Sequence, residues 1–239
     1  MIESIAYDLE GTVVDVEFAH HQGHIYAAEK VGVILTLEDC FQKLPHFMGG
    51  PDDQVAKEIA ALALQNGTEV SHESILENKR NHYELLLKEA EIRPRIGFLN
   101  FFNIIKYLGL ECTIGSLTDR EHAEVLLDRS GVGKLFGYEN IVLREHVKNP
   151  KPAPDVWYET AKRAGVNPED QLVFEDSPKG IKGAVQVGAY CIGMPVYNRP
   201  DIISALVDAG AKRIFMEWDE INPAQLIENI NGELGKEGR

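Results

Sequence analysis

The sequence has few cysteines and no pairing pattern among them. Its three cysteines, Cys40, Cys112 and Cys191, are odd in number and scattered, with no CxxC spacing. This excludes a disulfide scaffold and gives no support to a zinc site or a dithiol redox pair. We expect a protein of the reducing cytoplasm.

Basic residues are also scarce. The chain has 24 Lys and Arg against 38 Asp and Glu, a formal net charge of −14. A field of this sign repels polyanions, so we expect no nucleic acid and no membrane as partners. Any phosphate-bearing ligand must therefore be met by a local cation.

Long hydrophobic runs are missing. The longest apolar stretches, such as residues 59–64, are far shorter than the roughly 18 residues of a membrane span. Near the start, Glu3 stands where a secretory leader needs basic residues, so we expect a soluble protein without a targeting signal. The polar end at 232–239 is expected to be a frayed tail.

What the sequence does have is an alternation of apolar segments and helical patterns, with 44% apolar residues to build a core. Segments bounded by turn or cap signals predict strands at 4–9, 111–116, 140–143, 171–174, 190–194 and 213–218. Helical patterns lie between them at 98–108, 120–130, 155–164, 178–187 and 202–209. This alternation favours an α/β fold with a Rossmann-like parallel sheet.

The segment after the first strand is different, because helical periodicity dominates it and no strand interrupts it. We therefore expect an inserted all-helical cap domain at 16–95. The α/β core then consists of 1–15 plus 96–239.

Polar residues able to take part in catalysis or ligand binding follow four of the expected strands. In an open parallel sheet, ligands bind beyond the carboxyl ends of the strands. Two acidic pairs stand there, Asp8 with Glu10 and Glu175 with Asp176, and favour a hard cation such as Mg²⁺. Ser116 offers a hydroxyl and adjoining amides to a phosphate oxygen, and Lys151 offers the local positive charge.

These residues resemble a known family in order and spacing. The strings are DLEGTVVD from Asp8, then Ser116, then KPAPD from Lys151 and EDSPKG from Glu175. They resemble the four motifs of the haloacid dehalogenase-like phosphotransferases, and the helical-cap branch near β-phosphoglucomutase is the most similar. The resemblance covers essentially the whole chain.

The resemblance implies a role for each matching residue. Asp8 is the implied nucleophile, which forms an aspartyl phosphate, and Glu10 the implied general acid and base. Ser116, the adjoining Leu117 and Lys151 hold the transferring phosphoryl group. The implied Mg²⁺ ligands are Asp8, the Glu10 backbone carbonyl and Asp176, with Glu175 nearby.

Glu10 is the departure from the family pattern, which usually has Asp two residues after the nucleophile. The extra methylene changes the reach of the carboxyl group, and a misplacement on the order of 1 Å can cost roughly 10²-fold in rate. Glu also occurs in enolase-phosphatases, which look similar in having Asp-x-Glu-Gly-Thr. A working site and a slow one are both compatible with this residue.

Several motifs have a structural interpretation beside the functional one. Thr118 to Glu121 fits a capping box, so Thr118 is expected to be a helix N-cap. Ser177-Pro178 fits an N-cap followed by Pro at the first helical position. His20, His21 and His24 include an i, i+4 pair without a further ligand, and solvated or hinge histidines are expected.

The expected substrate loop of the cap is 47–53, which contains Asp52 and Asp53. Because acids there would repel a second phosphate, we expect a Mg²⁺-dependent phosphatase of a sugar or polyol monophosphate. Its expected partner is thus a small phosphorylated metabolite, and we expect the chain to be a monomer or weak dimer. The alternatives are a sugar phosphomutase of the β-phosphoglucomutase type and a nearly inactive phosphate-binding protein.

Overall fold

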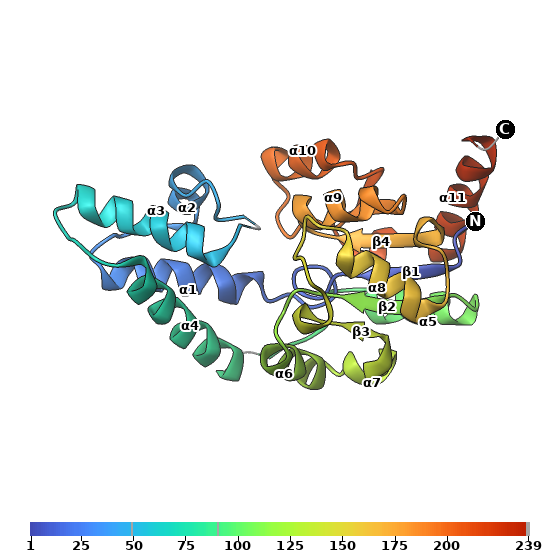
Figure 1. Ribbon diagram of the computed structural model, residues 1–239, viewed down its shortest axis with the longest axis horizontal. Helices are drawn as coiled ribbons and strands as arrows, with labels where there is room; N and C mark the ends of the chain where they lie inside the picture. The colour runs from blue at the N-terminus through green and yellow to red at the C-terminus, as the bar shows by residue number, and fades with distance from the viewer. Residues whose placement is uncertain (49, 90, 238–239) are drawn as a thin grey trace. The chain divides into compact units, whose positions relative to one another are not determined.

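The computed structural model describes residues 1–48, 50–89 and 91–237 and contains two compact units. One comprises Met1–Asp15 and Ile92–Arg239, and the other comprises Val16–Glu91 (Figure 1). The first is an α/β unit and the second is helical. Among the described residues, no helix is both long enough and apolar enough to cross a membrane.

The α/β unit is built on a six-stranded sheet in which every neighbouring pair is parallel. The strand order is β3-β2-β1-β4-β5-β6. The strands are β1 Ser4–Tyr7, β2 Glu111–Gly115, β3 Ile141–Val142, β4 Gln171–Glu175, β5 Tyr190–Gly193 and β6 Arg213–Ile214. The chain builds outward from β1 on both sides, so the strand order reverses between β1 and β4, where ligands bind in such sheets.

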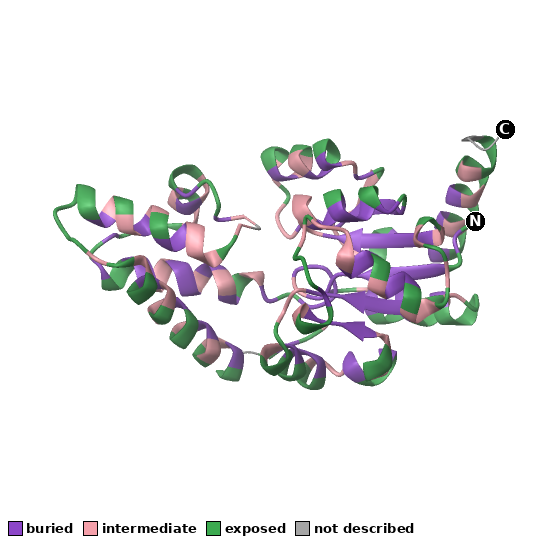
Figure 2. Ribbon diagram, in the orientation of Figure 1, coloured by how far each residue is buried: buried purple, intermediate pink, exposed green. Residues whose placement is uncertain are grey.

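Helices cover both faces of this sheet, which explains why the central strands are buried throughout (Figure 2). On one face, α8 Asp155–Ala164, α9 Pro178–Gln186 and α10 Pro200–Ala209 contribute to an apolar cluster with the strands. Trp157, Ile181 and Leu206 belong to it, together with Ala6 and Val173. Each of these helices follows an apolar period of 3.6 residues, as expected.

The opposite face is packed with aromatic rings. The Tyr7 ring stacks on Phe174 at 5.7 Å and meets the edge of Phe98 at 5.5 Å between centroids. Phe98 lies on α5 Phe98–Tyr107, and Trp218 on the short η4 Trp218–Glu220 packs 4.8 Å from Phe174. The remaining helical segments of this unit are α6 Arg120–Ser130, α7 Gly133–Phe136, η1 Tyr138–Asn140, η2 Arg144–His146, η3 Pro168–Asp170 and α11 Pro223–Glu237.

The chain beyond 232 differs from the expected frayed tail, since α11 continues to Glu237 and only 238–239 lie outside the described residues. Leu226 and Ile230 are buried on this helix. Glu233 accepts hydrogen bonds from the Tyr190 hydroxyl at 2.9 Å and from Arg213 at 2.5 Å. These tertiary contacts hold the last turns, which local polarity alone does not indicate.

The helical unit consists of α1 Glu17–Lys30, α2 Leu37–Lys43, α3 Asp52–Gln65 and α4 His72–Glu89. It has its own core, which includes Ala27, Phe47, Ile59 and Ile75. The unit ends at Glu91, four residues before the boundary expected at 95.

Arg95 explains why the residues after Glu91 belong to the α/β unit. Its buried guanidinium donates to the Gly11 carbonyl at 2.7 Å and to the Met194 carbonyl at 2.8 Å, and it also donates to the Met216 carbonyl. One side chain thus ties together the loops that follow β1, β5 and β6. It fixes the Gly11 turn, which borders the site described next.

Candidate functional site

A lysine joins two carboxylates across the ends of β1 and β4. Asp8 directly follows β1, and its N–H still donates to the Phe174 carbonyl at 3.0 Å. Lys151 Nζ lies 2.5 Å from Asp8 Oδ1 and 2.7 Å from Glu175 Oε2. It also donates to the Gly115 carbonyl at 3.0 Å, so residues from three strand ends meet at one ammonium group.

The turn after β1 brings the chain close to Asp176. Gly11 has φ +79°, a left-handed conformation that glycine adopts without strain, and its N–H donates to the Val14 carbonyl at 2.8 Å. A Cβ atom at Gly11 would stand 2.4 Å from Asp176 Oδ2. Thr12 donates to the other Asp176 oxygen, Oδ1, at 3.2 Å. Glycine is therefore required at 11 both for the turn and for the close approach.

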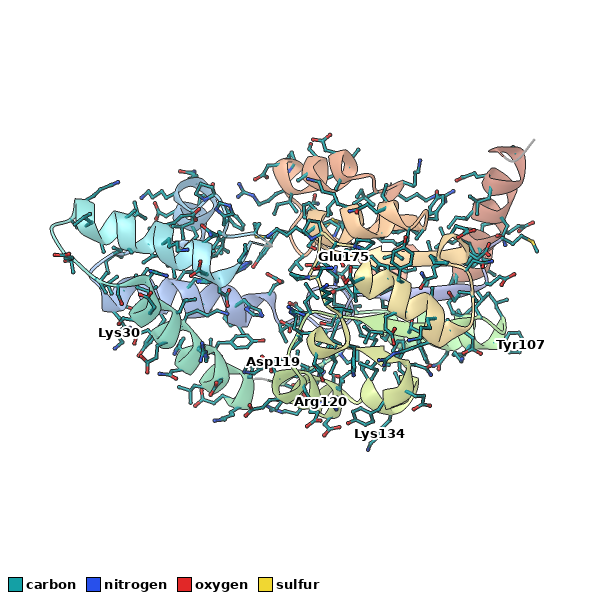
Figure 3. The ribbon with its side chains drawn as sticks, viewed as in Figure 1. Lys30, Tyr107, Asp119, Arg120, Lys134 and Glu175 are labelled. Atoms are coloured by element: carbon teal, nitrogen blue, oxygen red, sulfur yellow. The ribbon has the colours of Figure 1, made fainter. Side chains whose placement is uncertain are left out.

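Glu175 is held on both carboxylate oxygens. Its Oε1 accepts from the Ser177 N–H at 3.1 Å and from the Ser177 hydroxyl at 2.7 Å, while Oε2 accepts from Lys151. Ser177 is also the N-cap of α9, accepting from the Gly180 N–H at 3.1 Å, with Pro178 in the first turn. The expected cap is confirmed, and the same residue orients a site carboxylate. Figure 3 labels Glu175, which ends β4.

The site is buried and carries more negative than positive charge. Asp8 is 7% exposed and Glu175 is 1% exposed. Burial, with the Glu175 carboxylate, raises the pKa of Asp8 well above its usual range, while Lys151 opposes that rise. Burial alone would lower the pKa of Lys151, but Asp8 and Glu175 outweigh it and raise that pKa. The ammonium also lies 4.7 Å from the centre of the Trp157 ring.

Asp8, Glu175 and Asp176 form a group able to hold a metal ion, with one oxygen from each lying within 4.8 Å of the others. Three carboxylates beside one ammonium leave two negative charges to balance, which suits a divalent cation. Oxygen donors of this kind are those that hard cations prefer. The donor set therefore fits a hard divalent metal, with Asp8 and Asp176 as the better placed ligands, because Glu175 is engaged by Ser177 and Lys151.

The end of β2 adds a chain of hydroxyl groups. Ser116 is buried, and its N–H donates to the Val142 carbonyl at 3.0 Å. Ser116 Oγ lies 2.8 Å from Thr118 Oγ1, and the Thr118 hydroxyl donates to Glu10 Oε1. The half-buried Leu117 lies between Ser116 and Thr118 in the chain and packs against the apolar cluster to which α8, α9 and α10 contribute. Glu10 is thus joined to the end of β2, and Ser116 and Leu117 lie beside it.

The expected role of Thr118 as helix N-cap is wrong. The N-cap of α6 is Asp119, whose carboxylate accepts from the His122 N–H at 3.1 Å, and α6 begins at Arg120 (Figure 3). Moving the helix start by one residue turns the Thr118 side chain away from the helix and toward Glu10. Thr12 and Thr118 are the site residues to which the sequence gave no functional role. Thr12 lay within the matched string that starts at Asp8, and Thr118 stands two residues after Ser116.

Of the three histidines expected to be solvated or to lie at a hinge, two are not solvated. His21 and His24 are buried, and His24 Nε2 lies 3.0 Å from Asp52 Oδ1. Lys79, only 4% exposed, donates to Asp52 Oδ2 at 2.7 Å and lies 2.9 Å from His20 Nδ1. These contacts make a polar network inside the helical unit.

The acids of the expected substrate loop are compensated. Asp52 pairs with Lys79, and Asp53 pairs with Lys57 at 2.6 Å and with His72 at 3.3 Å. The expectation that this loop repels a second phosphate therefore loses its basis, since each acid has a cationic neighbour. Gly49, within the loop, lies outside the described residues.

Comparison with known proteins agrees with this geometry. A family model for haloacid dehalogenase-like hydrolases matches residues 2–188. The phosphorylated carbohydrates phosphatase of Thermotoga maritima is 28% identical over 222 residues, covering 92% of this chain and 97% of the relative. The fructose-1-phosphate phosphatase of Escherichia coli is 27% identical over 184 residues, covering 77% of this chain and 92% of the relative.

Solved structures show the same fold. A HAD hydrolase of family IA, variant 3, from Entamoeba histolytica superposes with a TM-score of 0.80 at 23% identity, covering 96% of this chain and 100% of that one. The family match spans both units and every strand end that forms the site. The chain belongs to the haloacid dehalogenase-like hydrolases.

Proposed function

We propose that the protein is a Mg²⁺-dependent phosphoric monoester hydrolase acting on a sugar or polyol monophosphate through an aspartyl phosphate on Asp8. The observation that carries this proposal is the buried Lys151 bridge between Asp8 and Glu175, with Asp176 beside it. A carboxylate at a strand end, oriented by an ammonium group, is a nucleophile placed to meet an anionic phosphate.

In the first step, an Asp8 carboxylate oxygen attacks phosphorus and the bond from phosphorus to the leaving oxygen breaks. Glu10 gives its proton to that oxygen, so the alcohol leaves neutral. Lys151 orients Asp8, opposes the rise in the pKa of Asp8 and adds positive charge beside the incoming phosphoryl group. Ser116 offers its hydroxyl to a phosphoryl oxygen.

In the second step, water attacks the same phosphorus and loses a proton to the Glu10 carboxylate. The bond from phosphorus to the Asp8 oxygen breaks, inorganic phosphate leaves and the Asp8 carboxylate is restored. Glu10 ends the cycle protonated, as it began. A phosphomutase would use the same two steps, with a sugar hydroxyl in place of water.

Asp8 and Asp176 would hold Mg²⁺, with the Glu10 backbone carbonyl as a third ligand implied by the family. The ion would offset the charge repulsion between these carboxylates and the substrate phosphate. The sugar class is supported by the two relatives named for phosphorylated carbohydrates and fructose 1-phosphate.

One assay tests the function. Release of inorganic phosphate is measured across a panel of sugar, polyol and other monophosphates, with Mg²⁺ and with excess chelator. We expect release from sugar or polyol phosphates only with the metal. Conversion of one sugar phosphate into an isomer without phosphate release assigns a mutase instead, and no reaction with any member refutes both.

Replacement of Asp176 by Asn is expected to weaken Mg²⁺ binding and to lower activity at subsaturating metal by at least about tenfold. Mutation of even an outer partner of a metal ligand typically costs about 10- to 100-fold in metal affinity or activity. Thr12 can still donate to the amide oxygen, so the fold is kept. Calorimetric titration with Mg²⁺ checks the affinity. Undiminished hydrolysis in excess chelator contradicts the metal assignment.

Replacement of Glu10 by Gln is expected to cost about 10²- to 10⁴-fold in turnover and to leave aspartyl phosphate trapped, because both proton transfers fail. Glu10→Asp is expected to be neutral or harmful, since Thr118 is placed for the longer arm. Rapid-quench detection of the phosphoenzyme checks both variants. A Glu10→Gln enzyme within about threefold of wild type, with Glu10→Asp faster, assigns a site that has drifted toward slow turnover.

A further inference from the structure

The chain after β2 contains a second hydroxyl group, that of Thr118, beside the residues proposed to react. Thr118 is half-buried and stands two residues after Ser116. Its side chain contacts one group on each side, Glu10 and Ser116. The two contacts join residues that serve different parts of the proposed reaction, proton transfer and phosphoryl binding.

The main chain of Thr118 is anchored independently of that hydroxyl. Its N–H donates to Ser116 Oγ at 3.2 Å, and its carbonyl accepts from the Arg144 N–H at 3.2 Å. The backbone is thus held at both ends of the residue. Helix α6 gains nothing from the Thr118 hydroxyl, because Asp119 caps it.

The hydrogen-bond donors show which contact the hydroxyl serves. Thr118 has one hydroxyl proton and donates it to Glu10 Oε1. Thr118 Oγ1 can then only accept from the Ser116 hydroxyl, which turns to a phosphoryl oxygen when substrate binds. The contact to Glu10 is therefore the one that the Thr118 hydrogen makes, and it does not need the Ser116 proton.

We propose that Thr118 is a positioning residue for Glu10, which it holds at a fixed point so that the carboxyl group reaches the leaving oxygen. The inference rests on the proposed function. Glu has one more rotatable bond than the Asp usual in this family, so its carboxyl group has more positions to occupy. A hydrogen bond from a fixed backbone selects one of them.

This role predicts that loss of the Thr118 hydroxyl affects two kinds of substrate differently. A sugar alkoxide leaves slowly unless it is protonated, whereas p-nitrophenolate leaves readily without a proton. A loosely held Glu10 therefore lowers phosphoryl transfer from a sugar phosphate much more than transfer from p-nitrophenyl phosphate. The ratio kcat/KM reports this first transfer for both substrates, free of the later hydrolysis of aspartyl phosphate.

The experiment compares Thr118→Val and Thr118→Ser with wild type, using the best sugar monophosphate of the panel and p-nitrophenyl phosphate. For Thr118→Val we expect kcat/KM to fall about 10- to 100-fold on the sugar phosphate and to stay within about threefold on p-nitrophenyl phosphate. Thr118→Ser, which keeps the hydroxyl, restores the sugar phosphate activity. Thr118→Ala replaces Thr118→Val if the latter does not fold.

Ser116→Ala is the matched control, because loss of a phosphate-binding hydroxyl lowers kcat/KM on both substrates alike. Combining Thr118→Val with Glu10→Gln gives a second control, since Thr118→Val should cost nothing further when Glu10 has no proton to position. Equal losses on both substrates in Thr118→Val, or full additivity with Glu10→Gln, overturn the assignment.

The two proposals fail in different ways. A selective loss in Glu10→Gln without one in Thr118→Val overturns the role of Thr118 and leaves the proposed function intact. A wild-type protein that releases no phosphate from any substrate refutes the proposed function and, with it, this role.

Discussion

Replacement of Asp8 by Asn is expected to lower phosphate release on the order of 10⁴-fold or more, because the amide cannot form the aspartyl phosphate. Asn is nearly isosteric with Asp, and its amide oxygen can still accept the hydrogen bond that Lys151 donates to Asp8. Burial disfavours the charge on Asp8, so its removal should leave the free energy of unfolding unchanged or higher. Steady-state release of phosphate and thermal unfolding measure the two effects.

Beryllium fluoride gives a direct readout of the same residue. It should form a stable acyl-phosphate mimic on wild-type Asp8 and none on the Asn variant. Asp208→Asn, at an exposed position on α10, is the matched control and should keep full activity and the adduct. Wild-type rates in Asp8→Asn, or an adduct at another residue, would remove Asp8 from the mechanism.

Replacement of Lys151 by Met is expected to reduce activity to near background and to lower the free energy of unfolding by about 3–5 kcal/mol. Met matches the length of the Lys side chain, but the buried Asp8 and Glu175 carboxylates then lose the cation they share. Steady-state assays and denaturant unfolding in the presence of chelator measure both quantities.

The loss of stability in Lys151→Met should depend on pH. Burial and Glu175 already raise the pKa of Asp8, and removing the ammonium removes the contact that opposes this rise. A carboxyl group with a raised pKa in the folded state binds more protons there than in the unfolded state, so stability falls as pH rises. The variant is expected to be least impaired near pH 5 and most impaired near pH 8.

A second substitution separates charge from catalysis. Lys151→Met combined with Glu175→Gln should recover much of the lost stability, because one buried charge is removed, while activity stays absent. A Lys151→Met protein with wild-type stability at every pH would contradict the picture of a shared buried cation.

The sequence by itself determined where the main site residues lie. Asp8, Ser116 and Glu175 each stand at or just after the end of an apolar segment, and parallel strands bring their carboxyl ends to one edge of the sheet. Several helices could also be predicted to within two residues, because their apolar period and caps are local signals. The inserted helical unit followed from the absence of any strand pattern.

Tertiary structure decided the contacts between distant residues. Thr118 and Glu10 are 108 residues apart, and the capping pattern at 118–121 fitted Thr118 locally. Asp is also a favoured N-cap residue, and the packed fold places the cap one position later, at Asp119. Local propensity cannot rank two caps that differ by one residue in register.

Lys79 makes the same point in the helical unit. Nothing near it on α4 marks it as buried, since lysine is usually solvated. Its burial requires Asp52 from α3 and His20 from α1, which approach it only when three helices pack together. A buried charge is tolerated when partners arrive from elsewhere in the chain, so periodicity located the helices, and their packing alone decided which charges they could bury.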